Sequence, residues 1–117
     1  MKNAIVVVMG IAVAIAAFGD KAESSTANSF LNGVQLYEKC NGGSISATVS
    51  CNSYIIGAID SIFVLDYGKT VCAQSEADFQ QLVDVVIRDL REIPEYRHYA
   101  AADIILNAMR KAFPCKQ

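Results

Sequence analysis

The sequence predicts an all-α fold, a compact bundle of about four helices that two disulfides staple together. Apolar residues recur at helical spacing in four segments of the 117-residue chain, and polar or Gly- and Pro-containing stretches separate these segments. Four cysteines follow an apolar amino-terminal segment. An even number of cysteines behind an export signal is typical of paired disulfides in an oxidising compartment.

Residues 1–19 have the pattern of a secretory signal peptide. Lys2 supplies a positive charge, and residues 5–18 form an apolar run that is shorter than the roughly 20 residues a membrane-spanning helix needs. Small residues precede Asp20, which predicts cleavage before this residue; cleavage after Ala16 is an alternative. The competing interpretation is an uncleaved amino-terminal anchor. No cysteine lies beside the cut, so a lipobox is absent.

The expected organisation is a signal peptide at 1–19, a flexible polar lead-in at 20–28 and one helical domain at 29–117. Removal of the signal peptide takes away one lysine and no acid, so the net charge changes from −2 to −3. A mildly acidic chain without a clustered basic face argues against nucleic acid as a partner. We expect no membrane association after cleavage.

The first helix is expected at 29–40. Phe30, Val34 and Tyr37 fall at i, i+4 and i+7, which predicts that they share an apolar face. The stretch 41–44 (Asn-Gly-Gly-Ser) is a strong helix breaker.

The second helix is expected at about 46–65. Its apolar residues extend around most of the circumference, which predicts a buried central helix. Gly57 is expected to permit close approach of another helix. Asp60 is a carboxylate in an apolar segment, so it must be paired, exposed at a groove or placed at an interface.

The third helix is expected to start near Ser75 and Asp78, which resemble a capping box, and to end before Pro94. Pro94 can then begin the last helix, with His98 in its first turn. Pro114 closes this last helix. The apolar residues of the two helices lie at helical spacing: Phe79, Leu82, Val83, Val86 and Leu90, then Ala101, Ile104, Ile105, Ala108, Met109 and Ala112.

The four cysteines allow three disulfide pairings. Cys40 and Cys51 flank the first breaker, and Cys72 and Cys115 lie at the outer ends of the last two helices. This arrangement favours Cys40–Cys51 and Cys72–Cys115. Zinc is the competing interpretation, but the chain has no Cys-x-x-Cys pair and one histidine, so we expect no metal site.

We expect neither a catalytic site nor a cofactor. His98 is the one imidazole, and neither a paired base nor a nucleophile accompanies it. The polar connection between the second and third helices, formed by Asp66, Tyr67, Gly68, Lys69 and Thr70, is the candidate partner-binding segment. Tyr67 in a loop has the character of an interface anchor.

Several motifs resemble the type VI secretion amidase immunity proteins of the Tai/Rap-like family. The most specific is the Cys-x-x-Tyr-x-x-Gly-x-x-Asp element that starts at Cys51 and contains Tyr54, Gly57 and Asp60. The others are the segment 90–98, which ends at His98, and the terminal Phe113-Pro114-Cys115. The segment after Cys72 departs from the family pattern, because Ala73 and Gln74 stand where a proline is expected.

The resemblance implies a periplasmic, helical and commonly homodimeric protein. Such a protein binds a cognate peptidoglycan amidase effector and blocks its Cys-His active site. An exported helical chaperone or small-ligand-binding protein of the cell envelope is the alternative function. A hydrolase is a third class, for which the sequence offers no plausible nucleophile.

Overall fold

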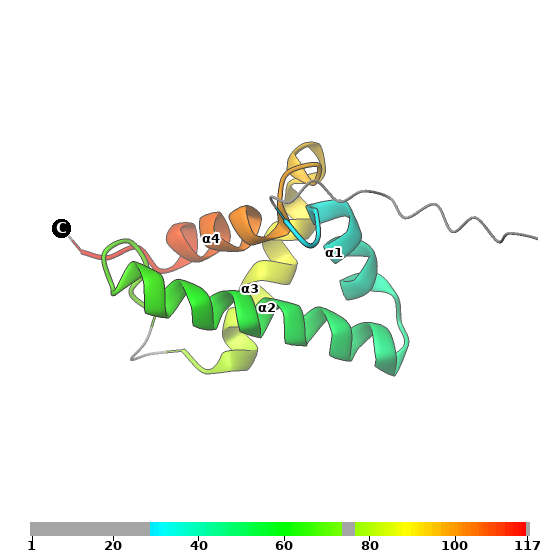
Figure 1. Ribbon diagram of the computed structural model, residues 1–117, viewed down its shortest axis with the longest axis horizontal. Helices are drawn as coiled ribbons and strands as arrows, with labels where there is room; N and C mark the ends of the chain where they lie inside the picture. The colour runs from blue at the N-terminus through cyan, green and yellow to red at the C-terminus, as the bar shows by residue number, and fades with distance from the viewer. Residues whose placement is uncertain (1–28, 74–76, 117) are drawn as a thin grey trace, which may run out of the picture.

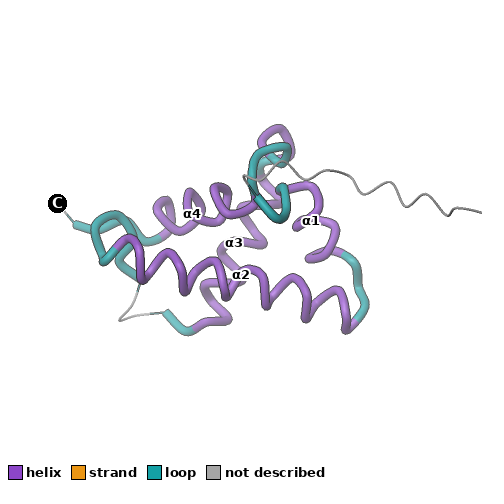
Figure 2. The backbone as a smooth tube through the Cα atoms, viewed as in Figure 1, coloured by secondary structure: helices purple, strands orange, loops and turns teal. Residues whose placement is uncertain are grey.

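The computed structural model describes residues 29–73 and 77–116. Within these residues it has α-helices and a short 3-10 turn and no strand, so the predicted all-α class is confirmed (Figures 1 and 2). The elements are α1 (Gly33–Asn41), α2 (Ile45–Asp66), α3 (Phe79–Glu92), η1 (Pro94–Tyr96) and α4 (Ala101–Ala112). The predicted signal peptide and lead-in lie outside the described residues.

The four helices surround one apolar core. α1 packs against α2, and α3 packs against α4; α2 and α4 also lie side by side (Figure 1). The loop that follows α2 and the carboxyl terminus meet at the end of the molecule remote from α1 (Figure 1). The largest fully buried side chains are those of Leu36, Ile55, Ile59, Leu90, Ile105, Met109, Val71, Val83, Val86 and Cys51.

The first helix begins later than the sequence periodicity suggested. Asn32 is its N-cap, because its side chain accepts a hydrogen bond from the Gln35 N–H while the Gln35 side chain accepts one from the Asn32 N–H. Phe30 therefore precedes the helix and is 82% exposed, and Val34 is also exposed. The predicted apolar face was wrong for Phe30 and Val34, whereas Tyr37 packs half-buried against the core, and Leu31 and Leu36 are buried.

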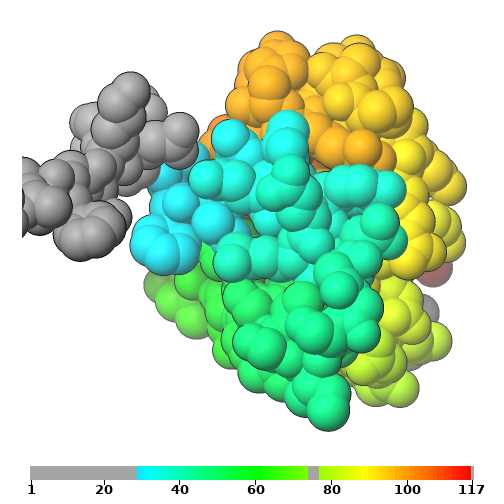
Figure 3. All heavy atoms as spheres, turned by 90° about the vertical axis from the view of Figure 1, so that its right-hand side faces the viewer, coloured from blue at the N-terminus to red at the C-terminus, as the bar shows by residue number. Residues whose placement is uncertain are grey.

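The start of α1 is attached to the connection between α3 and α4. The N–H groups of Gly33 and Val34 donate to the carbonyls of Tyr99 and Arg97, which satisfies two of the donors left free at a helix start. The Arg97 guanidinium lies 3.6 Å from the ring centroid of Tyr37 and also donates to the Leu90 carbonyl. Figure 3 shows α1 beside this connection.

The prediction that α2 is buried all round was wrong. Cys51, Ile55 and Ile59 recur every fourth residue and are fully buried, but Val49 and Leu65 are 58% and 76% exposed. A high apolar content therefore does not reveal the buried face here. Among the described residues, one helix is long and apolar enough to cross a membrane, and this helix is α2. Core helices of soluble proteins have the same length and composition.

α3 starts at the predicted Asp78, whereas α4 starts later than predicted. The N-cap of α3 is Asp78, which forms a capping box with Gln81; Ser75 lies outside the described residues. Pro94 begins η1 and not an α-helix, because α4 starts only at Ala101. His98 therefore lies in the connection, exposed, with its ring centroid 4.2 Å from that of Tyr99.

Both predicted disulfides are confirmed. Cys40–Cys51 joins α1 to α2, and Cys72–Cys115 joins the loop after α2 to the segment after α4. Their sequence separations are 11 and 43 residues. In the chain-entropy account these closures stabilise the fold by about 3 and about 4 kcal/mol. These are large amounts for a domain of this size.

Two glycines give a matched test of the packing. A Cβ at Gly33 would lie 2.8 Å from the Arg97 carbonyl oxygen, whereas a Cβ at Gly57 would meet nothing within 4 Å. We expect Gly57→Ala to raise the free energy of unfolding by about 1 kcal/mol, because alanine is the better helix former. Gly33→Ala should lower it, since two of the three nearest atoms belong to the Arg97 backbone and cannot move aside as the Ile104 side chain can. Urea denaturation measures both; a loss of stability in Gly57→Ala would contradict the open environment.

Candidate functional site

The loop after α2 reverses the chain through two residues in the left-handed region. Tyr67 has φ 47° and ψ 36°, and Gly68 has φ 70°. The position just after a helix often adopts this conformation, and glycine is the usual residue there. A bulky side chain in the left-handed region is strained by about 1–2 kcal/mol. The loop thus places an aromatic residue where glycine would be conformationally cheaper.

The Asp66 carboxylate accepts hydrogen bonds from the loop that follows it. Its Oδ2 atom accepts hydrogen bonds from the N–H groups of Thr70 and Val71, at 2.8 and 3.0 Å, and its Oδ1 atom accepts one from the Thr70 hydroxyl. These bonds favour the charged carboxylate and lower the pKa of Asp66 to about 2; the Thr70 hydroxyl contributes most. The carboxylate therefore stays charged and can accept these hydrogen bonds throughout the physiological pH range.

Side-chain and backbone contacts hold the same loop against the end of α4. The Arg110 Nε–H donates to the Thr70 hydroxyl oxygen at 2.9 Å. The Cys72 N–H donates to the Phe113 carbonyl, and Val71 forms an isolated β-bridge with Pro114. The Phe113 and Pro114 that the sequence singled out are thus part of this attachment.

The disulfide lies directly beside the loop backbone. The Gly68 carbonyl oxygen is 3.1 Å from the Cys115 sulfur and 3.5 Å from the Cys72 sulfur. Neither sulfur has a proton to donate, because both are in the disulfide, so these are packing contacts.

The surface around Tyr67 is apolar and exposed to solvent. Tyr67 is 76% exposed, and the neighbouring Val64 and Leu65 are also exposed. Lys69 is exposed beside them. A rigid loop with an exposed aromatic residue is typical of a binding surface, since little side-chain and loop entropy remains to be lost on association.

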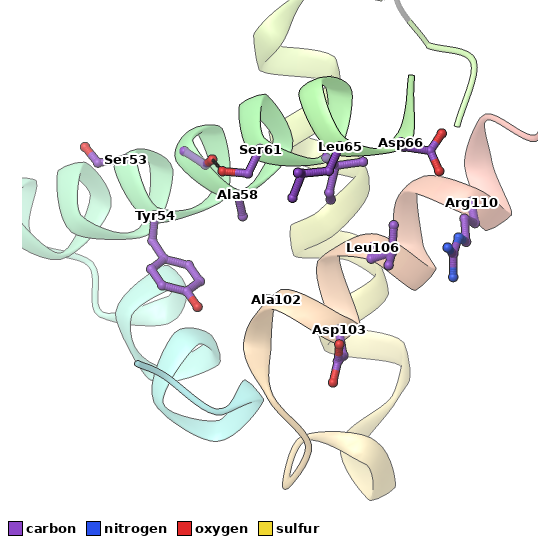
Figure 4. Close-up of a pocket in the computed structure, with 12 residues that line it drawn as sticks. Ser53, Tyr54, Ala58, Ser61, Leu65, Asp66, Ala102, Asp103, Leu106 and Arg110 are labelled. Atoms are coloured by element: carbon purple, nitrogen blue, oxygen red, sulfur yellow. Dashed lines mark hydrogen bonds between the residues drawn. The ribbon is translucent and has the colours of Figure 1, made fainter. Parts of the chain in front are cut away.

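An open groove of about 680 Å³ leads from this loop along the surface between α2 and α4 (Figure 4). Leu65 and Leu106 contribute its apolar walls, and Asp66 and Arg110 lie at the loop end. Tyr54 and Gly57 from the predicted motif line it as well. Burial raises the pKa of the Tyr54 hydroxyl. The sequence did not predict this groove, because it depends on the distance between two helices.

The other singled-out residues lie apart from the loop. Asp60 is exposed on α2, and no described residue forms an ion pair with it. Gly57 faces open space, so the predicted close approach of another helix is wrong for the described part of the chain. His98 lies beside η1, whereas the loop follows α2. The described residues contain no cluster of His, Cys, Asp and Glu that could hold a metal ion.

The pH dependence of the loop tests the role of Asp66. Its pKa is lower in the folded chain than in the unfolded chain, so the carboxylate stabilises the loop above pH 4. We expect this stabilisation to fade as the pH falls through about 2. NMR titration of the Thr70 and Val71 amide protons should therefore give a midpoint near 2. A midpoint near 4 in both amides would show that the carboxylate does not hold the loop.

The comparison with protein families matches residues 32–115 to the Rap1a immunity proteins. This match spans all the helices, both disulfides and the loop. No curated protein sequence matches the chain. The resemblance carried by the motifs around Cys51 and Cys115 is thereby confirmed at the level of the family. The chain belongs to the Rap1a immunity proteins, a family of type VI secretion immunity proteins.

Proposed function

We propose that this protein is a periplasmic immunity protein that binds a peptidoglycan amidase effector of type VI secretion and blocks its Cys-His active site. Family membership supports an effector-binding and non-catalytic role. The two disulfides support an exported protein. The apolar segment at 1–19 is then the signal peptide that directs the chain to the compartment where such an effector acts.

The observation that carries the proposal is the construction of the loop at 66–70. An active-site cleft is blocked best by an element that protrudes and is already ordered. Tyr67 is 76% exposed on this loop, and both the Asp66 carboxylate and the Cys72–Cys115 disulfide order the loop. In the proposed complex Tyr67 enters the effector cleft, and Val64 and Leu65 cover the rim.

We further propose that the protein is a homodimer, as the family resemblance implies. Sedimentation velocity at micromolar concentration measures this property directly. A mass of one chain at every concentration would exclude the homodimer without affecting the role of the loop.

A second candidate function is binding of an apolar small molecule or an unfolded client in the cell envelope. The groove between α2 and α4 favours it, because its volume of about 680 Å³ and its apolar walls suit a small ligand. Effector binding predicts that Leu106→Arg leaves amidase inhibition largely intact. The chaperone function predicts that the same substitution abolishes suppression of client aggregation.

Substitution of Tyr67 separates binding from stability. Tyr67→Gly should maintain or raise the melting temperature, because glycine adopts the left-handed conformation without strain. It should also weaken binding of the amidase about 30-fold or more, as loss of a central aromatic anchor does. Calorimetric titration with a purified Cys-His peptidoglycan amidase effector measures the affinity, and chromatography of released muropeptides measures inhibition.

Tyr96→Ala is the matched control, since Tyr96 is 52% exposed and lies in η1 and not in the loop. We expect this variant to bind and inhibit like the original protein. Equal losses in the two variants, or full inhibition by Tyr67→Gly, would exclude the loop as the inhibitory element.

A further inference from the structure

The two disulfides differ in what surrounds them. Cys51 is 1% exposed and lies in the core, Cys40 is half-buried, and both belong to helices that pack against each other. Cys72 is exposed, and Cys115 is half-buried. Neither Cys72 nor Cys115 belongs to a helix. Attack by an external thiol needs access to a sulfur atom, so the two bridges offer a reductant different targets.

Opening the two bridges also has different consequences. If Cys40–Cys51 opens, α1 and α2 still hold the two sulfurs near each other, and the bridge can close again. If Cys72–Cys115 opens, neither cysteine lies in a helix, so no helical hydrogen bonds hold the two sulfurs near each other. The Gly68 carbonyl, 3.1 and 3.5 Å from the two sulfurs, then lies beside two separate side chains and no longer beside a covalent bridge.

We propose that Cys72–Cys115 is a redox switch for the binding loop: closed, it orders residues 66–70 for the effector, and open, it leaves the helical core intact while the loop loses its fixed shape. This inference rests on the proposed function, because it assigns regulation to the same loop. It implies that the chain becomes fully competent to bind only after oxidation.

The reaction is an ordinary thiol–disulfide exchange with a dithiol. One thiolate of the dithiol attacks a sulfur of the bridge, forms a mixed disulfide and releases the other cysteine as a thiolate. The second thiol of the dithiol then closes its own disulfide and releases the second cysteine. The protein gains two electrons and two protons, and the dithiol loses them.

The first test is the order of reduction. The full chain is purified with both disulfides formed, equilibrated in graded ratios of reduced to oxidised dithiothreitol, and alkylated with iodoacetamide. Peptide mass spectrometry then locates the modified cysteines. We expect Cys72 and Cys115 to be alkylated at ratios where Cys40 and Cys51 remain paired. Reduction of Cys40–Cys51 first, or of both bridges together, would overturn the proposal.

The second test measures the consequence for the loop. At the ratio that opens only Cys72–Cys115, circular dichroism should retain the helical signal, and amide hydrogen exchange should accelerate at residues 66–72. Unchanged exchange there would overturn the proposal, as would loss of the helical signal. Both measurements use the protein alone, so they do not depend on the identity of the effector.

The third test connects the switch to binding. The affinity for the amidase should fall about tenfold or more on selective reduction, and Cys72→Ser/Cys115→Ser should bind with this lower affinity whether or not dithiothreitol is present. Unchanged affinity would overturn the switch. If the oxidised protein does not bind the amidase at all, the proposed function fails, and selective opening is still judged by the first two tests.

Discussion

The Cys72–Cys115 disulfide is the constraint on which the loop at 66–70, the proposed binding surface, depends. It joins two segments that are 43 residues apart in the sequence and brings the loop after α2 against the end of α4. The shorter-range contacts then act on a loop whose position is already fixed. Arg110 donates a hydrogen bond to the Thr70 hydroxyl, and the Asp66 carboxylate accepts hydrogen bonds from the loop backbone. Covalent attachment, charge and hydrogen bonding therefore support the same exposed conformation of Tyr67.

The fold keeps a considerable apolar surface in contact with solvent. α2 uses one stripe for the core and leaves Val49 and Leu65 exposed, although a small domain has few apolar side chains to spare. Monomeric soluble proteins rarely expose large continuous apolar surfaces, and such surfaces mark interaction sites. The groove between α2 and α4 continues this surface from the loop. A binding protein gains from such an arrangement, because its stability comes from disulfides and a small core while its outer surface stays available.

The sequence predicted those features that depend on local patterns. The buried faces of α3 and α4 followed from helical spacing, except for Phe79, which is 53% exposed. The disulfide pairs followed from the cysteines on either side of the first breaker and at the outer ends of the last two helices. The spacing of Asn32 and Gln35 is a readable capping box that would have placed the start of α1 after Phe30. The exposed side of α2 could not be predicted, because the apolar character of a residue does not show whether another helix packs against it. The position of the loop at 66–70 was predicted from the sequence. The hydrogen bonds of Asp66 were not, because they depend on a reversal of the chain that only the structure shows.

In the proposed complex Tyr67 lies in the active-site cleft of the bound amidase. Site-specific photo-cross-linking tests this placement, with a benzophenone side chain at position 67 and mass spectrometry of the cross-linked effector peptides. We expect adducts on residues that line the cleft around the catalytic cysteine and histidine. Adducts confined to another face of the amidase, or their absence in a complex that still forms, would contradict it.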